Sequence, residues 1–148
     1  MKRHPALVSL SRDHHQALAA ALRLRRAAAH DVDGAAAAFV VFWEPRGRRH
    51  FEIEEELLVP AIPASDAVWT RAADRVRAEH DRLRGLASDL TLAVNRVTVA
   101  HDLGERLHDH VRFEERELFV MLEERLTNDD LGQLARAIEA AEARPHGP

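Results

Sequence analysis

Apolar residues recur at three- and four-residue spacings along almost the whole chain, a periodicity typical of amphipathic helices. Gly and Pro, which interrupt helices, occur only six times each among 148 residues, whereas the helix-favouring residues Ala, Leu, Glu and Arg are abundant. A chain of this length can bury a substantial core. We therefore expect an all-α protein, organised as a single domain over residues 1–148.

Caps and breakers divide the chain into predicted helices. Pro45 and Gly47 fall inside one of them and predict a kink there. Four long helices joined by short turns pack antiparallel, so we expect a four-helix bundle followed by a short fifth helix at the C-terminus. The long helices are expected from about Ser9 or Ser11 to Ala29, from Ala35 (capped by Asp33) to Val59, from just after Ser65–Asp66 to about Asn95, and from Thr98 to Leu126, and the short one, capped by Thr127–Asn128, to about Ala143.

Each long helix has an apolar stripe that should face the core, and some His and Glu residues share these stripes on a helical wheel at 100° per residue. On the first helix His14 falls between two stripe residues, whereas His15 is turned about 100° away, so His14 is preferred and His15 stays an alternative. The predicted stripes are Leu10, Leu18, Ala21 and Leu22; Phe39, Trp43, Ile53 and Leu57; Trp69, Ala73, Val76, Leu83, Ala87 and Leu90; and Leu103, Leu107, Leu118, Met121 and Leu122.

Six inward-facing polar residues predict a metal site, because burying each such group unpaired would cost several kcal/mol. The four histidines are separated by 36, 30 and 30 residues, so antiparallel helices return them to a similar depth. A His and a Glu at i, i+4 can hold one metal, and bundle-core metal centres are assembled from facing helices in this way. The predicted ligands are His14, His50, Glu54, His80, His110 and Glu114.

The expected centre holds two metals. If both carboxylates bridge the metals and the imidazoles divide two and two, each metal receives four protein ligands, and a six-coordinate ion keeps two open positions. Cysteine is absent, which excludes disulfides, thiolate catalysis and iron–sulfur ligation. Mixed imidazole and carboxylate ligands suit iron or manganese, and also zinc, and we expect iron.

The charge and hydropathy of the sequence limit its expected partners and location. The 21 basic and 25 acidic residues are interleaved, which argues against nucleic acid as a partner. No segment has the roughly 18 uninterrupted apolar residues of a membrane span, and the basic start has no signal-peptide apolar run, so the cytoplasm is the expected location.

Other His and Glu residues favour plainer interpretations. A third His-x-x-x-Glu pair, His101–Glu105, points away from the stripe and is interpreted as surface. Glu55 and Glu115 rank second as ligands.

A ferritin-like oxidase would use Glu-x-x-His pairs, and only Glu105–His108 fits that pattern. A metal-free helical interaction module is the structural alternative. The histidines expected to face solvent are His4, His30, His108 and His146.

The segments SLSRDHHQAL, RRHFEIEEELLVPAI, RAEHDRL and LHDHVRFEERELFVMLEERL together resemble the hemerythrin-like HHE cation-binding family over nearly the whole chain. The resemblance implies an up-down-up-down bundle with a diiron centre and assigns the ligand roles to the six residues above. Respiratory hemerythrins have a second His four residues after the third-helix ligand, where this chain has Arg84, and a guanidinium cannot coordinate metal. The two-plus-two set is similar to that of bacterial repair-of-iron-centres proteins, although those carry an additional cysteine-containing segment.

The expected function is that of a diiron protein that binds or reacts with O2, NO or peroxide, in sensing or in defence against oxidative or nitrosative stress. The most specific form of this hypothesis is the turnover of hydrogen peroxide. Iron or oxygen storage or delivery without turnover, and repair of iron centres, are the alternatives. The sequence identifies no protein partner.

Overall fold

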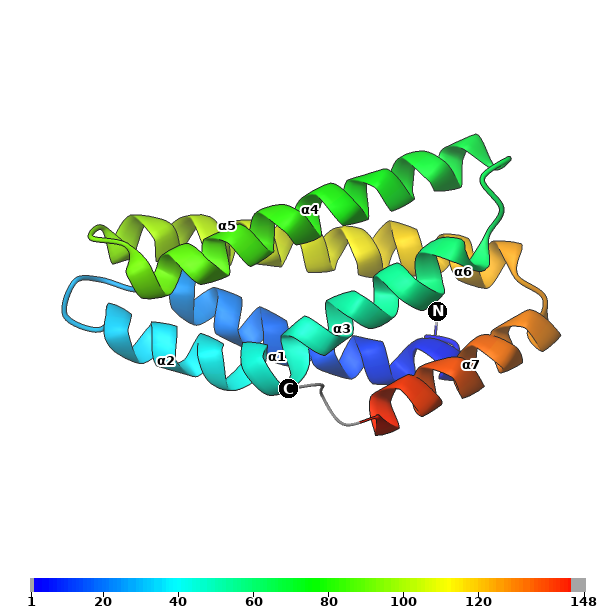
Figure 1. Cartoon of the computed structure of the whole chain (residues 1–148), viewed down its shortest axis with the longest axis horizontal. Coiled ribbons are helices and arrows are strands. Elements are labelled where there is room, and N and C mark those ends of the chain that lie inside the picture. The colour runs from blue at the N-terminus through cyan, green and yellow to red at the C-terminus, as the bar shows by residue number, and fades with distance from the viewer. Residues whose placement is uncertain (1, 145–148) are drawn as a thin grey trace.

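Helices packed side by side along one long axis make up the protein in the computed structural model, which describes residues 2–144 (Figure 1). Four helical columns alternate in direction, a shorter fifth helix lies against their outside, and the described residues form no strand. The predicted all-α bundle with a short C-terminal helix is therefore confirmed. The α-helices are α1 (Val8–Arg25), α2 (Val32–Phe42), α3 (Arg48–Ile53), α4 (Ala67–Leu92), α5 (Arg96–Phe113), α6 (Phe119–Arg125) and α7 (Asn128–Ala143).

The second and fourth columns each contain π-helical turns, which hold one residue more than an α-helical turn. In the second column, Trp43–Gly47 joins α2 to α3, and Glu54–Leu58 follows α3 before a 3₁₀ turn, Val59–Ala61. In the fourth, Glu114–Leu118 joins α5 to α6. The ribbon changes direction between α2 and α3, at the predicted kink (Figure 1). The chain stays helical there because the wider turn accommodates Pro45, which has no N–H to donate.

The N-terminal caps of the first two columns differ from the predictions. A 3₁₀ turn, Pro5–Leu7, precedes α1, so Ser9 and Ser11 lie inside the helix and cap nothing. Pro fixes the backbone of that first turn, and the His4 ring accepts a hydrogen bond from the backbone N–H of Ala6.

The loop before α2 also makes one helix end earlier than predicted. Asp31 accepts a hydrogen bond from the Ala28 N–H at 2.7 Å, which turns the chain early. As a result α1 ends at Arg25 rather than Ala29, and Asp33 lies in the first turn of α2 instead of capping it. The ends predicted for the other helices agree with the structure within three residues.

α4 starts after Ser65–Asp66 as predicted, and Thr127 caps α7 as predicted. The Asp66 carboxylate accepts from the Trp69 N–H at 3.0 Å. Thr127 and Asp130 form a reciprocal capping box at the start of α7. α7 then packs against the Pro5–Leu7 turn and α3, closing one end of the bundle.

The apolar core consists of two clusters. The Trp43 cluster lies between α1, α2, α4 and α5, and the Trp69 cluster joins the other end of the bundle to α7. Most predicted stripe residues are buried in one cluster or the other, but Leu22 is 44% exposed, so its assignment was wrong. The predicted residues that are only partly buried are Leu18, Leu57 and Met121.

α1 and α5 approach each other closely at Gly104. A Cβ at this position would lie 2.7 Å from the backbone oxygen of Ala21 and 2.9 Å from the backbone nitrogen of Arg25. Only a residue without a side chain allows this spacing, which aligns the first and fourth columns around the polar layer described below.

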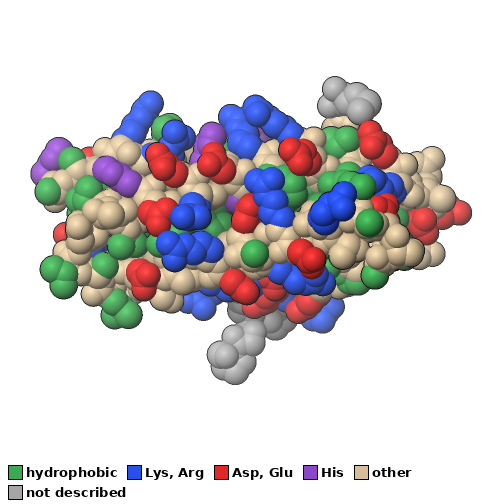
Figure 2. Space-filling view, turned by 90° about the horizontal axis from the view of Figure 1, so that it is seen from above, with side chains coloured by type: hydrophobic (Ala, Val, Ile, Leu, Met, Phe, Trp, Pro, Cys, Tyr) green, Lys and Arg blue, Asp and Glu red, His purple; other side chains and the backbone are tan. Residues whose placement is uncertain are grey.

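The surface carries both charges. Acidic and basic side chains are interspersed on the face shown in Figure 2, as the interleaved sequence predicts. Among residues 2–144, no helix is both long enough and apolar enough to cross a membrane.

Candidate metal centre

Each of the four columns contributes one inward histidine to a single layer between the two apolar clusters. We call this the His/Glu layer: His14 from α1, His50 from α3, His80 from α4, His110 from α5, and Glu54 and Glu114 from the two π-helical turns that follow α3 and α5. All six side chains are buried, with residue exposures between 0% and 4%. His15 is exposed, so the structure brings His14 into the layer and leaves its neighbour outside.

The layer divides into two groups of four residues that share the carboxylates. His14 and His50 join Glu54 and Glu114 in one group, and in the other His80 and His110 join the same two carboxylates. Within each group the candidate ligand atoms lie within 4.8 Å of one another. A six-coordinate ion with bonds of about 2.1 Å separates opposite ligands by about 4.2 Å, so each group has the dimensions of one metal site.

The two halves of the layer are related by an approximate repeat. The π-helical turn Glu54–Leu58 recurs 60 positions later as Glu114–Leu118, and each begins at its inward carboxylate, four residues after an inward His. π-helical turns are frequent at functional sites, where the extra residue changes which side chains face inward.

Inside the layer, the Nε2 atoms of the histidines converge on the carboxylates. The closest approaches are His110 Nε2 to Glu114 at 2.8 Å and His50 Nε2 to Glu54 at 2.9 Å. His14 and His50 also face each other at 3.1 Å between their Nε2 atoms, and so do His80 and His110.

On the side that faces away from the layer, each of its four histidines bonds a carboxylate through Nδ1. We call Asp13, Glu55, Glu79 and Glu115 the outer carboxylates. The distances are 3.1 Å for His50–Asp13, 2.8 Å for His80–Glu55, 3.1 Å for His110–Glu79 and 2.6 Å for His14–Glu115. Each Nδ1–H therefore has an acceptor, which leaves Nε2 as the lone pair directed into the layer.

An arginine pairs with each outer carboxylate in turn. The pairs are Arg46–Asp13 at 3.2 Å, Arg84–Glu55 at 2.8 Å, Arg75–Glu79 at 2.9 Å and Arg3–Glu115 at 2.9 Å. Four chains of imidazole, carboxylate and guanidinium thus lead from the layer to the surface. These charged bonds fix the orientation of each ring.

The layer fits a cation by the chemistry of its donors. With Nδ1 protonated, the four Nε2 atoms and four carboxylate oxygens are all acceptors. None of the Glu54 and Glu114 oxygens has a hydrogen-bond partner among residues 2–144, although imidazole nitrogens approach them to 2.9 and 2.8 Å. Buried acceptors without donors are costly, and a metal ion satisfies all of them together.

The pKa values of the layer show the same deficit of positive charge. Burial acts to lower the pKa of His50, but the charge of Glu54 and the bond to Asp13 outweigh it and raise that pKa to about 9. Burial acts likewise on His80, but the nearby carboxylates of Glu114, Glu54 and Glu55 outweigh it and raise its pKa to about 11. Without metal the acceptors hold protons, so metal and protons compete for the same nitrogens.

The two carboxylates that ranked second as predicted ligands lie outside the His/Glu layer. Glu55 and Glu115 do not point into the layer but bond histidines from outside it. Burial acts to raise the pKa of Glu55, but its bonds with His80 and Arg84 outweigh this and hold the pKa at about 2, so the carboxylate stays ionised. Sequence reasoning missed Asp13 and Glu79. The available signal was their position, because each is an acid that immediately precedes an inward histidine.

The remaining histidines lie outside the layer. His101 bonds the backbone oxygen of Ala27 at 2.7 Å, and its neighbour in the third His-x-x-x-Glu pair, Glu105, is exposed. His108 is partly exposed beside Asp109, and His30 is largely exposed. The fourth histidine predicted to face solvent, His4, is only partly exposed because it caps the first turn. His146 lies outside the described residues.

These features define a class of helical proteins that hold cations between the columns of a bundle. Comparison with protein families gives a match to the Hemerythrin HHE cation binding domain over residues 6–122. The chain therefore belongs to the hemerythrin HHE cation-binding family, as its motifs predict. Comparisons with curated proteins and with solved structures return no match.

Proposed function

We propose that this protein is a non-haem diiron protein whose centre binds or reacts with O2, NO or peroxide. The observation that carries the proposal is the His/Glu layer, in which buried acceptors form two groups that share both carboxylates. Imidazole and carboxylate donors without sulfur suit iron, and also manganese or zinc. When bound, two irons would supply redox chemistry and open positions for a small molecule.

The chain's own residues would hold and orient the metals. Glu54 and Glu114 would bridge both, because each lies in both groups. His14 and His50 would bind one metal, and His80 and His110 the other. The outer carboxylates would accept the Nδ1 protons and keep every Nε2 free to coordinate.

Arg84 supports the two-plus-two assignment of histidines. Its guanidinium bonds Glu55 at 2.8 Å, and Glu55 bonds the His80 Nδ1. The residue at this position therefore orients a ligand from outside the layer instead of adding a third imidazole to one metal. Equal histidine numbers on the two sides differ from the pattern of respiratory hemerythrins, which have a further His at this position, and support a reactive role over simple oxygen storage.

The test begins with protein purified under air. We expect about two irons per chain and near-ultraviolet absorption from an oxygen-bridged pair, with both lost in the His50→Ala/His110→Ala variant. The matched control is His15→Ala/His30→Ala, which removes two exposed histidines and should keep both signals. A protein that takes up neither iron nor manganese on reconstitution would show the ligand assignment to be wrong.

A loaded protein is then offered NO, O2 and hydrogen peroxide separately. Consumption of peroxide, or formation of an NO complex, would support the reactive role. Reversible absorption changes with O2 and no peroxide consumption would instead indicate storage or delivery. An iron-loaded protein that responds to none of the three would contradict the proposal while leaving the metal site intact.

A further inference from the structure

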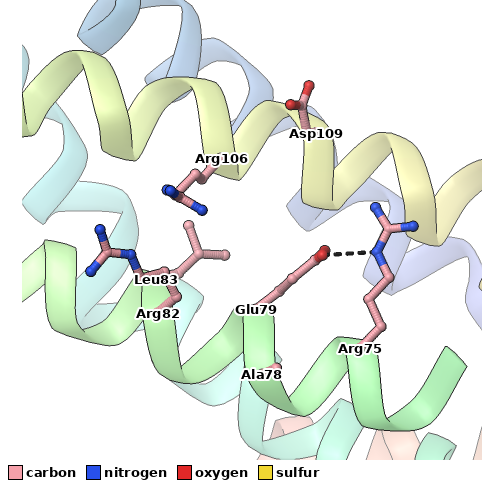
Figure 3. A pocket seen from close by; sticks show the side chains of 7 residues that line it. All are labelled: Arg75, Ala78, Glu79, Arg82, Leu83, Arg106 and Asp109. Carbon is pink, nitrogen blue, oxygen red and sulfur yellow. Dashed lines mark hydrogen bonds and ion pairs between the residues drawn. The ribbon is translucent and has the colours of Figure 1, made fainter. Parts of the chain in front are cut away.

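A cavity of about 370 Å³ lies between α4 and α5, next to one half of the His/Glu layer. We call it the α4–α5 cavity. Figure 3 shows Leu83 on α4 below Arg106, and the Glu79 side chain extending from α4 toward Arg75, to which it is bonded. Its lining residues are Arg75, Ala78, Glu79, Arg82, Leu83, Arg106 and Asp109. The volume is several times the roughly 30 Å³ that one water occupies in the liquid, so small molecules fit easily.

Glu79 connects this cavity to the layer directly. Its side chain is 28% exposed and lines the cavity, and the same carboxylate bonds the His110 Nδ1 at 3.1 Å. Leu83, which is almost fully buried, lies one turn after His80 and closes the cavity next to Glu79. A molecule in the cavity therefore contacts a carboxylate that is bonded to a ring of the His80/His110 group.

The equivalent position in the other half of the layer is closed. Asp13 precedes His14 as Glu79 precedes His80, and it bonds the His50 Nδ1 as Glu79 bonds that of His110. The Asp13 side chain, however, is only 8% exposed, with Arg46 paired to it. The two halves share their ligands and hydrogen bonds, but at this pair of equivalent positions the carboxylate is open to a cavity in one half and buried in the other.

The charges of the cavity favour an uncharged visitor. Arg75 is paired with Glu79 at 2.9 Å and Arg106 with Asp102 at 2.7 Å, and Arg82 lies 3.4 Å from Asp102. The arginines are thus already compensated and offer a weak site for an anion. They still provide N–H donors that keep the cavity hydrated and suited to a small polar molecule.

We propose that the α4–α5 cavity is the route by which a small uncharged molecule, such as NO or hydrogen peroxide, reaches the His80/His110 half of the centre, with Glu79 and Leu83 as its inner wall. This inference rests on the proposed function. It makes the two halves functionally unequal although their ligand sets are equivalent.

The test uses the absence of cysteine from the chain. Ala78→Cys places a single thiol at the cavity, on an exposed position, where a bulky maleimide can be attached. In the iron-loaded, reduced protein we expect the label to slow NO association about tenfold or more, measured by stopped-flow absorbance. The matched control is labelled Arg12→Cys, because Arg12 is exposed and precedes His14 by two residues, as Ala78 precedes His80.

A second readout locates the half that receives the molecule. Glu79→Gln changes the acceptor of His110 and should shift the N–O stretching frequency of the NO complex, whereas Asp13→Asn, acting on His50, should leave it nearly unchanged. If labelled Ala78→Cys binds NO at the rate of the control, or only Asp13→Asn shifts the frequency, the access route is wrong and the proposed function stands. If no variant and no parent protein forms an NO complex, the proposed function fails and this inference with it.

Discussion

Each imidazole of the His/Glu layer is fixed at both of its ring nitrogens. Nε2 faces the shared carboxylates, and Nδ1 bonds an outer carboxylate that an arginine holds in place. Sequence reasoning could find the six inward residues because they share faces with apolar side chains. It could not find the outer carboxylates' role, since Asp13 on α1 meets His50 on α3 only after the columns pack.

Removing one outer carboxylate should weaken metal binding without removing a ligand. In Glu55→Ala the His80 Nδ1 loses its acceptor, so we expect metal affinity to fall about 10- to 100-fold. The measurement is competition with a chelating indicator for Zn²⁺ or Fe²⁺. Glu44→Ala is the control, because Glu44 is exposed and pairs with Arg48 on the surface, and the metal affinity of this variant should equal that of the parent. Equal affinities in both variants would contradict the positioning role.

The metal-free protein should become less stable as the pH rises from about 6.5 to about 9. The pKa of His50 is raised from 6.5 to about 9, so between these values the folded state binds more protons than the unfolded state. The stabilisation is then complete below 6.5 and is lost as pH rises through 9. Urea unfolding at several pH values measures it. A midpoint that rises with pH across this window would disagree, and metal-loaded protein, whose histidines coordinate instead of binding protons, should show a smaller fall.

At the scale of elements, the helices were predictable, and the direction of their side chains was predictable except at some positions in or next to the π-helical turns. The predicted starts of α4, after Ser65–Asp66, and of α7, at the Thr127 cap, are correct, because capping depends on local sequence. The π-helical turns depend on packing around the layer, and a constant 100° per residue loses phase after each of them. Within the turn Glu54–Leu58, Leu57 was expected inside but Leu58 is fully buried, and directly after the turn Glu114–Leu118, Phe119 was not expected but is fully buried.

The close approach of α1 and α5 gives a prediction on one glycine. Gly104→Ala would place a Cβ 2.7 Å from the Ala21 backbone oxygen, and overpacking of this kind should destabilise the protein by about 1–3 kcal/mol. Gly85→Ala is the control, since a Cβ there meets nothing within 4 Å and should stabilise helix α4 by about 0.5–1 kcal/mol. Urea unfolding compares the two, and equal signs would show that α1 and α5 can separate at no cost.

At the scale of the whole molecule, the polar layer divides the core into the Trp43 cluster and the Trp69 cluster. A burial of six ionisable groups across the centre of a bundle weakens the apolar continuity on which cooperative unfolding depends. The metals would compensate by binding residues from all four columns. Bound metals would then couple the unfolding of the two clusters, in addition to supplying reactivity.

Metal removal should therefore lower stability and uncouple the two clusters. Each cluster contains one tryptophan, so Trp69→Phe leaves Trp43 to report on one cluster and Trp43→Phe leaves Trp69 to report on the other. In metal-loaded protein the two fluorescence transitions in urea should coincide, at a midpoint raised because the metals bind only the folded state. After chelation both midpoints should fall and the transitions should separate, since acceptors without a cation no longer tie the columns together. Coincident transitions at an unchanged midpoint would mean that the layer is stable by itself, and the protein would then be a helical bundle whose polar centre does not depend on metal.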